Sequence, residues 1–348
     1  MAGNAVSAIW GGGRQMKVLV TGGTGFVGSH SVAALVSRGH QVRLLVRSRD
    51  RVARSLSPLG VADVESVVGD VTVPQSVEEV MAGCDAVLHA AAVYSLDPRA
   101  ASRMRETNLR ATETVLGAAV RRGLDPVVHV SSYVALLPPE PRDAVLTADS
   151  PVTRPVGAYC QSKAESEQAA RRFQDQGAPV VIVYPGGVIG PDDPYLGDSN
   201  RNLAEFAKSG RGMRGGSPLV DVRDVAAVHA AVMEPGRGPR RYMITGHYVA
   251  VPDLIAMLQQ ITGHHTRIVI MPAGMTLAAG RVADLMQRLM PGRLPFSHEG
   301  IWISALQPHG DDSRTASELG ITARDLRETL TDTVRWLTDQ GHLPTAAL

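Results

Sequence analysis

Tyr159 and Lys163 are the residues whose types and spacing most clearly suggest chemistry. They stand four positions apart in a helical pattern, so their side chains project from one face of a helix. A nearby ammonium group can lower the pKa of a tyrosine hydroxyl from its reference of about 10 toward working pH, as a general acid or base requires. Ser132, at the end of an apolar run upstream, is a candidate third member. Together they predict a proton-transfer site.

A glycine-rich turn near the start of the chain is a second candidate site. The run Lys17 to Thr21 is expected to be a strand, and Gly22, Gly25 and Gly28 follow it just before a helical pattern. Glycine permits left-handed dihedrals and lets backbone N–H groups approach a phosphate at the positive end of the following helix. Another glycine run, Gly11 to Gly13, lacks this setting. We predict that the turn binds the pyrophosphate of a dinucleotide.

The elements that must position these residues alternate between two periodicities. Short β-branched runs alternate with stretches whose apolar residues recur at helical spacing, which predicts a doubly wound α/β fold with a parallel sheet and the site at the carboxyl ends of its strands. The expected strands are Lys17 to Thr21, Gln41 to Val46, Val64 to Val68, Ala86 to His89, Val127 to Ser131 and Val180 to Tyr184. The expected helices are Ser29 to Arg38, Ser76 to Met81, Thr107 to Arg122 and Tyr159 to Gln176.

After Tyr184 this alternation stops. Pro185 to Asp198 is rich in Gly, Pro and Asp and is expected to be a long loop near the site. We predict a dinucleotide-binding domain over 16–184, completed by parts of 219–246, and a smaller, interleaved substrate lobe over 185–218 and 247–348. The later elements are expected at Val220 to Met233 (helix), Arg241 to Thr245 (strand), Pro252 to Thr262 (helix) and Ala323 to Asp339 (helix).

Further short motifs occur with these in a consistent order. They are Gly69-Asp70-Val71, His89-Ala90-Ala91-Ala92, Asn108 within Thr107 to Thr112, Val130-Ser131-Ser132 and Tyr159-Cys160-Gln161-Ser162-Lys163. With the glycine turn, they resemble the extended short-chain dehydrogenase/reductases of the NAD-dependent epimerase/dehydratase superfamily, and most closely the dihydroflavonol reductase and 3β-hydroxysteroid dehydrogenase branch. The resemblance covers nearly the whole chain from Met16. It implies a Rossmann fold and hydride transfer between a nicotinamide cofactor and a carbonyl or secondary alcohol.

The resemblance also implies a role for each catalytic residue. Tyr159 would donate the proton in reduction, and Lys163 would hold a ribose hydroxyl and lower the pKa of the tyrosine. Ser132 would orient the substrate carbonyl, and Asn108 would hold a water or a backbone group in the proton relay. Ordinary structural roles remain open, because Ser132 could cap a turn and Asn108 could be a helix N-cap.

The implied cofactor surface is spread over several loops. Asp70 and Val71 would contact the adenine, although Asp70 alone could be a turn residue. Tyr184 stands where many members of the family have Arg, which leaves the pyrophosphate contacts open. The whole set is Gly22, Thr24, Gly25, Phe26, Val27, Gly28, Arg47, Ser48, Asp70, Val71, Ala90, Ala91, Ala92, Tyr159, Lys163, Pro185, Gly186 and Val188.

The end of the second strand predicts which dinucleotide binds. In this fold an acidic residue there binds the ribose 2′-hydroxyl, whereas a basic residue accommodates a 2′-phosphate. Here the strand is followed by Arg47, Ser48 and Arg49, which offer a guanidinium fork and a hydroxyl donor. A solvated basic turn is the alternative, with Asp50 offsetting part of the charge. We predict NADP as the cofactor, with NAD less favoured.

The predicted activity is interconversion of a carbonyl and a secondary alcohol. A bulky apolar substrate is favoured by the Met- and Leu-rich segment Met271 to Phe296, although an ordinary packed helix would show the same pattern. A nucleotide-sugar epimerase or dehydratase of the superfamily would use the same tyrosine but retain its cofactor through a full cycle. A non-catalytic dinucleotide-sensing protein would not need Tyr159, Lys163 and Ser132.

Composition limits the partners to small molecules. A net charge of +1, from 35 basic and 34 acidic residues, gives no one-signed surface for nucleic acid or an anionic membrane. No apolar run approaches the roughly 20 residues of a membrane span. Cys84 and Cys160 cannot form a disulfide framework, which favours the cytoplasm, and the histidines show no metal-ligand spacing.

Two expectations concern the ends and the assembly of the chain. Residues 1–15 are expected to be a disordered leader without a catalytic role, with Met16 as an alternative start. The resemblance implies a homodimer formed through the helices around Asn108 and Tyr159.

Overall fold

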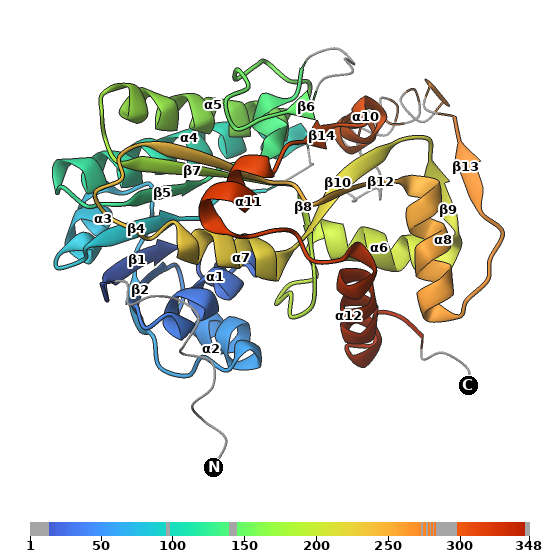
Figure 1. The fold of residues 1–348 in the computed structure, drawn as a ribbon, viewed down its shortest axis with the longest axis horizontal. Coiled ribbons are helices and arrows are strands. Elements are labelled where there is room, and N and C mark those ends of the chain that lie inside the picture. The colour runs from blue at the N-terminus through green and yellow to red at the C-terminus, as the bar shows by residue number, and fades with distance from the viewer. Residues whose placement is uncertain are drawn as a thin grey trace.

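A seven-stranded parallel sheet forms the centre of the computed structural model, which describes residues 14–94, 98–138, 145–272 and 298–344 together with 274, 275, 278, 280 and 282. The strand order is β11-β7-β5-β4-β1-β2-β3, and every neighbouring pair is parallel; Figure 1 shows the central strands β7, β5, β4, β1 and β2. This confirms the doubly wound α/β fold. The strands are β1 (Lys17–Thr21), β2 (Gln41–Val46), β3 (Glu65–Val68), β4 (Ala86–His89), β5 (Val127–Val130), β7 (Val180–Pro185) and β11 (Arg240–Ile244).

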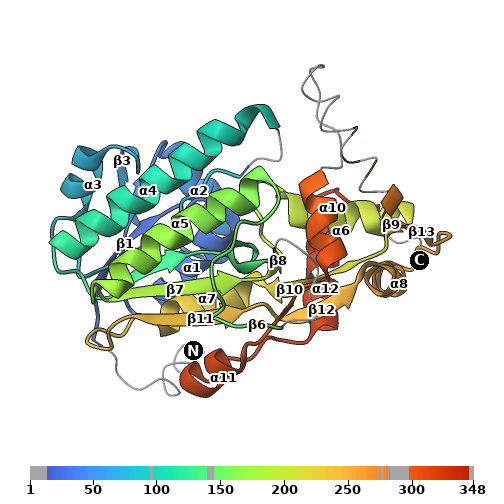
Figure 2. The same ribbon diagram turned by 90° about the horizontal axis from the view of Figure 1, so that it is seen from above.

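Helices cover both faces of this sheet. On one face α4 (Ala101–Arg121) and α5 (Ala158–Asp175) run side by side, with α3 (Pro74–Met81) next to α4 (Figure 2). On the other face α1 (Phe26–Ser37) packs against α7 (Val222–Ala231), with α2 (Asp50–Leu56) beside α1. Successive side chains of a strand point to opposite faces of the sheet, and helices cover both faces. Each central strand therefore needs apolar side chains on both faces, and its Val, Leu and Ile residues provide them.

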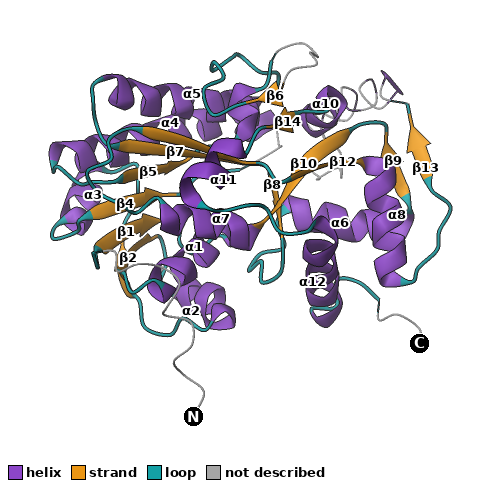
Figure 3. Cartoon of the chain, in the orientation of Figure 1, coloured by secondary structure: helices purple, strands orange, loops and turns teal. Residues whose placement is uncertain are grey.

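A smaller lobe lies beside the carboxyl ends of the strands (Figure 3). It contains a three-stranded sheet, a parallel strand pair and three helices whose apolar faces share one core. These elements are β8 (Gly187–Ile189), β10 (Gly216–Asp221), β12 (His247–Ala250), β9 (Arg211–Met213), β13 (Val269–Met271), α6 (Asp198–Ser209), α8 (Val251–Thr262) and α12 (Leu326–Asp339). The remaining elements are α10 (His298–Leu306), α11 (Ser313–Leu319), a β6 (Val145–Leu146) and β14 (His309–Gly310) pair, and short 3-10 helices at Ser57–Leu59, Pro98–Ala100 and Tyr133–Leu136.

Three of the differences between the structure and the sequence-based expectation concern the elements around the site. The expected loop over 185–198 contains strand β8, which is too short to show a periodicity and pairs in parallel with β10. The expected helix over 220–233 begins only at Val222, because β10 extends to Asp221 and the Asp221 side chain caps α7 by accepting from the Arg223 N–H. Helix α4 begins at Ala101, earlier than the expected Thr107.

The described residues also bear on several simpler expectations. Met16 is buried, and its carbonyl accepts a hydrogen bond from the Gln41 N–H, while 1–13 lie outside the described residues. Cys84 and Cys160 are both free thiols. Within the described ranges, every helix is too short or too polar to cross a membrane.

Candidate active site

The predicted site residues meet where the strand order reverses. From β1 the chain continues outward to β2 and β3, whereas β4, β5 and β7 lie on the other side of β1. The carboxyl ends of β1 and β4 therefore bound the switch point at which ligands bind in open α/β sheets. The glycine turn follows β1, Ala90 follows β4 and Ser132 follows β5.

Tyr159 lies in the first turn of α5 and is half-buried. Its ring packs edge-on against that of Tyr94, with the ring centroids 4.7 Å apart. Burial raises the pKa of Tyr159 above its ordinary value, helped by Cys160, Tyr133 and Glu299, and only interaction with the Ser132 side chain opposes this rise. In the chain by itself, desolvation of the phenolate is the largest effect on this pKa, and the lowering expected from Lys163 stays a prediction.

Lys163 lies one helical turn further along α5. Its Nζ donates to the carbonyl oxygens of Val130 at 3.4 Å and Ser131 at 3.5 Å, so the ammonium group is held at the end of β5. Burial lowers the pKa of Lys163 from 10.5 to about 8, although the Glu167 carboxylate on the next turn acts in the opposite direction. Lys163 therefore loses its charge only slightly above neutral pH.

Ser132 lies at the end of β5 and is nearly buried. Its Oγ accepts a hydrogen bond from the Val134 N–H at 3.4 Å and caps the 3-10 helix Tyr133–Leu136. The ordinary structural role of Ser132 is thus present, and interaction with its side chain also acts to lower the pKa of Tyr159. Tyr133 points elsewhere, because its hydroxyl lies 3.2 Å from the Oγ of Ser217 on β10.

Asn108 is buried within α4, so the expectation that it might be a helix N-cap is wrong. Its Oδ1 accepts from the Val93 N–H at 2.7 Å, and its Nδ2 donates to the Val93 carbonyl at 2.9 Å and to the Ser162 Oγ at 2.8 Å. The side chain therefore links the backbone of the segment after β4 to the Ser162 hydroxyl on α5. This arrangement fixes where Tyr94, next to Val93, meets Tyr159.

The glycines of the turn are of two kinds: Gly22 and Gly28 are required by packing within the protein, whereas Gly25 leaves space for a ligand. A Cβ on Gly22 would lie 2.6 Å from the Ala90 carbonyl carbon, and one on Gly28 would lie 2.1 Å from the Gly22 oxygen, so the protein's own packing requires these two glycines. Gly25, the N-cap of α1, is different, because a Cβ there would meet only the Gly22 oxygen at 3.4 Å. The first turn of α1 carries no side-chain cap and no acidic residue. The helix end is therefore open to a phosphate beside Gly25.

The tips of β2 and β3 bring Arg47 and Asp70 near each other. Arg47 is exposed, and its charge contributes to lowering the pKa of Asp70, which is lowered mainly by the hydrogen bond from the Thr72 N–H. Asp70 thus has the turn role that its sequence context allowed, since its Oδ1 accepts from both the N–H and the hydroxyl of Thr72. Ser48 Oγ donates to the Asp50 carboxylate at 3.2 Å.

The other predicted cofactor residues surround the same edge. Thr24 has its carbonyl bound by the Ser55 hydroxyl, and the N–H groups of Ala90 and Ala91 both reach Thr21. Phe26 and Val27 open α1, Val71 follows Asp70, and Ala92 is exposed after β4. The segment of Pro185, Gly186 and Val188 leads from β7 into β8.

Tyr184 does not reach toward the glycine turn. It is completely buried, and its hydroxyl donates to the Glu167 carboxylate at 2.6 Å and accepts from Arg171 at 3.0 Å. Both partners lie on α5, so this residue stabilises the packing of α5 on the sheet.

Glu299 is a residue at this site that sequence reasoning missed. It lies on α10, and its carboxylate accepts hydrogen bonds from the N–H groups of Tyr159 and Cys160. The only local signal is Gly157, which precedes α5 and leaves this helix without a capping side chain. No spacing rule could connect Tyr159 to a carboxylate 140 residues later.

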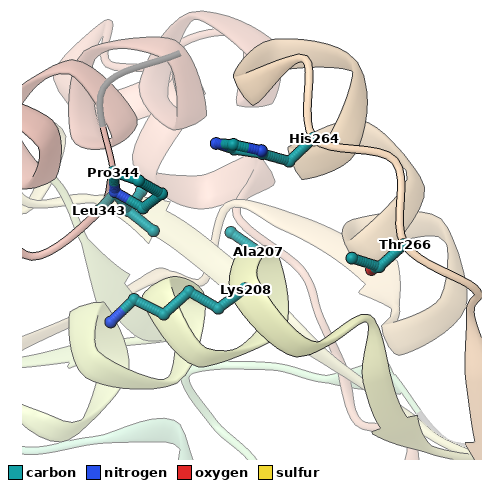
Figure 4. Close-up of a pocket in the computed structure, with 6 residues that line it drawn as sticks. All are labelled: Ala207, Lys208, His264, Thr266, Leu343 and Pro344. Atoms are coloured by element: carbon teal, nitrogen blue, oxygen red, sulfur yellow. The ribbon is translucent and has the colours of Figure 1, made fainter. Parts of the chain in front are cut away.

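The apolar segment Met271 to Phe296 and the absence of a metal site are two further expectations from the sequence. Of the apolar segment Met271 to Phe296, the described side chains of Met271, Met275 and Val282 are exposed, and most of the segment lies outside the described residues. A pocket of about 140 Å³ opens in the smaller lobe between Lys208, His264 and Pro344, and it shares no residue with the predicted site (Figure 4). Among the described residues, no three metal-ligating side chains cluster.

The parallel sheet, the open glycine turn at its switch point and the adjoining Tyr-Lys helix define a Rossmann-type dinucleotide-binding protein. The chain belongs to the NAD dependent epimerase/dehydratase family, whose model matches residues 18–245. This confirms the resemblance found in the motifs and makes a nicotinamide dinucleotide the expected cofactor.

Individual relatives match along almost the whole chain. A Synechocystis sp. protein assigned as a dihydroflavonol 4-reductase is 32% identical over 94% of this chain and 96% of its own length. A 4-hydroxy-2-methyl-3-oxo-4-farnesyl-3,4-dihydroquinoline-1-oxide ketoreductase from Stigmatella aurantiaca is 30% identical over 94% of this chain and 99% of its own. The crystal structure of gox2253 matches with a TM-score of 0.78 at 26% identity, covering 94% of this chain and 100% of that one.

Proposed function

We propose that this protein is an NADP(H)-dependent reductase that interconverts a carbonyl and a secondary alcohol. The observation that carries the proposal is the convergence of Tyr159, Ser132 and Lys163 beside the glycine turn, since Tyr159 interacts with Ser132 and Lys163 binds the backbone just before it. The reductase and ketoreductase names of two relatives support it. A protein that only sensed dinucleotides would not need this arrangement.

The residues divide the chemistry of reduction between them. A bound nicotinamide would supply the hydride for the carbonyl carbon, and the Tyr159 hydroxyl would donate a proton to the carbonyl oxygen. Because burial keeps the pKa of Tyr159 above its ordinary value, the hydroxyl is protonated at neutral pH and ready to donate. The Ser132 hydroxyl orients the carbonyl, and the Lys163 ammonium binds a ribose hydroxyl of the cofactor.

The test is Tyr159→Phe, assayed by NADPH oxidation against a panel of ketones and aldehydes. Losing a general acid should lower kcat by about 10²- to 10⁴-fold while leaving the cofactor Kd nearly unchanged. Lys163→Ala should weaken both turnover and cofactor binding. Tyr248→Phe, on the β12 strand of the smaller lobe, is the matched control. If Tyr159→Phe keeps most of its kcat, another group donates the proton.

The preference for NADP rests on Arg47 at the tip of β2. Its exposed guanidinium group is available to the 2′-phosphate, and the tip carries no carboxylate before Asp50. Arg47→Asp should raise the KM for NADP about a hundredfold and shift preference toward NAD. Equal or better kcat/KM with NAD in the unmodified protein would defeat this assignment.

A bulky apolar substrate is the finer part of the proposal. It is supported by the half-exposed ring of Tyr94 against Tyr159 and by the farnesyl dihydroquinoline in the name of one relative. Comparing kcat/KM for cyclic apolar ketones and for nucleotide-diphosphate sugars tests it. Activity confined to the sugars would refute the apolar substrate and favour an epimerase or dehydratase.

A further inference from the structure

We infer that Glu299 is a positioning residue for Tyr159: its carboxylate closes the N-terminus of α5 and holds the Tyr159 hydroxyl in its protonated, proton-donating form. The inference rests on the proposed function for its consequence but not for its geometry. It gives α10, an element with no predicted site residue, a role in keeping the Tyr159 hydroxyl protonated.

The contacts are direct and buried. Glu299 Oε1 accepts from the Cys160 N–H at 2.7 Å, and Oε2 accepts from the Tyr159 N–H at 3.2 Å. The Glu299 side chain is only 7% exposed. Two of the N–H groups that every helix leaves unpaired at its start are thus bound by one carboxylate from a distant element.

The helix start is shaped to admit this carboxylate. Gly157, the N-cap of α5, has a φ of +97°, a conformation that side chains rarely adopt. A Cβ at Gly157 would lie 2.2 Å from Cδ of Glu299, so any larger residue would displace the carboxylate. Glycine also offers no capping side chain of its own, which leaves Glu299 as the cap.

Charge explains why the cap matters for Tyr159. A bare helix N-terminus carries a positive partial charge, which would favour the phenolate of a tyrosine in the first turn. The carboxylate offsets that charge and also repels a phenolate, so it favours the neutral hydroxyl. Burial raises the pKa of Glu299, while the N–H groups of Cys160 and Tyr159 that it binds act in the opposite direction and favour its ionised form.

The other groups around Tyr159 leave Glu299 as the anion. The groups that act on Tyr159 or pack against it are Cys160 on its own helix, Ser132 and Tyr133 after β5, Tyr94 after β4, and Glu299 on α10, and Lys163 lies one helical turn further along α5. The Cys160 thiol is kept neutral, because burial and Glu299 raise its pKa. Lys163 is the cation of this group, and its ammonium is bound to the Val130 and Ser131 carbonyls.

The experiment is a pH titration of Tyr159, followed by NMR in the absence of substrate. The protein is isotope-labelled at the Cζ atom of its tyrosines. The Tyr159 resonance is identified by its loss in Tyr159→Phe. In Glu299→Gln, which keeps the size of the side chain but removes the charge, ionisation of Tyr159 should begin about one pH unit lower than in the unmodified protein. Glu299→Asp keeps the charge but places it further from the helix, because its side chain is one methylene shorter. It should therefore lower the pH at which Tyr159 begins to ionise by a smaller amount.

The control is Glu165→Gln, which removes a carboxylate from the same helix on the side where it pairs with Arg105. This control should leave the onset unchanged. If folded Glu299→Gln, or folded Glu299→Asp where Gln does not fold, begins to ionise no earlier than the unmodified chain, the inference is overturned. The readout needs no turnover, so failure of the proposed reductase activity would show separately, as retained kcat in Tyr159→Phe.

Discussion

Helices α1 and α5 both begin at a glycine that provides no capping side chain, yet their first turns are used in opposite ways. At α1, Gly25 borders open space and the first turn has no acidic residue. At α5, Gly157 is pressed against Glu299, whose carboxylate binds two backbone N–H groups. A helix N-terminus is a ready anion site, and this protein leaves one for a ligand and fills the other itself.

The difference shows how the same local feature acquires two functions. The open end of α1 can attract the phosphates of a cofactor, whereas the closed end of α5 cannot compete for them and instead controls the tyrosine that it carries. Under the proposed function, the glycine at α1 lets a ligand approach, whereas Gly157 at α5 leaves room for a protein carboxylate. Substitutions at these glycines should therefore separate binding from stability.

Gly28→Ala should give the largest effect. Its Cβ would lie 2.1 Å from the Gly22 carbonyl oxygen, a backbone atom that cannot move without opening the turn. We expect a loss of about 3 kcal/mol in the free energy of unfolding, measured by urea denaturation, together with loss of cofactor binding by calorimetry. Stability equal to that of the unmodified chain would mean that the turn is looser than the structure shows.

Gly157→Ala should cost somewhat less, about 2 kcal/mol, because the new Cβ meets a side chain that can swing away and the left-handed φ is strained. Gly177→Ala is a matched control, since Gly177 has a φ of +81° but nothing within 4 Å of its Cβ position. The excess cost of Gly157→Ala over Gly177→Ala in chemical denaturation measures the Glu299 contact. If the two variants lose equal free energy of unfolding, the contact between Gly157 and Glu299 does not constrain position 157.

Gly25→Ala should change binding but not folding. The Gly25 backbone is extended, and its Cβ would meet only one atom at ordinary contact distance, so the melting temperature should stay within about two degrees. The methyl group would stand where the phosphates approach, so we expect about a tenfold higher Kd for the cofactor, or about 1.4 kcal/mol. Unchanged affinity would show that the phosphates do not use this helix end.

The pH dependence of binding should also separate the two ends. The pKa of Lys163 on α5 is lowered to about 8, so its ammonium is present below that pH and is lost as the pH rises through it. The cofactor Kd should increase about fivefold between roughly pH 7 and pH 9. Adenosine 2′,5′-bisphosphate, which lacks the nicotinamide ribose, should bind equally well across this range, and Lys163→Met should abolish the step for the whole cofactor. A flat profile in the unmodified protein would contradict the role of Lys163.

Much of the fold was predictable because its signals are local. Strands β1, β2 and β4 match their predicted bounds, since Val and Leu dominate each strand and most of its residues are buried. The short strand β8 and the early start of α4 escaped prediction. A three-residue strand has no period to detect, and the first turns of α4 are largely polar.

The sequence by itself determined the fold class, the glycine turn and the spacing of Tyr159 and Lys163, because each depends on residues within a few turns of one another. Only the tertiary structure decided which helix end is open, that Asn108 ties Val93 to α5, and that Glu299 closes the helix of Tyr159. The physical reason is that hydrogen bonds and desolvation depend on what packs against a group. For Tyr159, that includes a carboxylate 140 residues away.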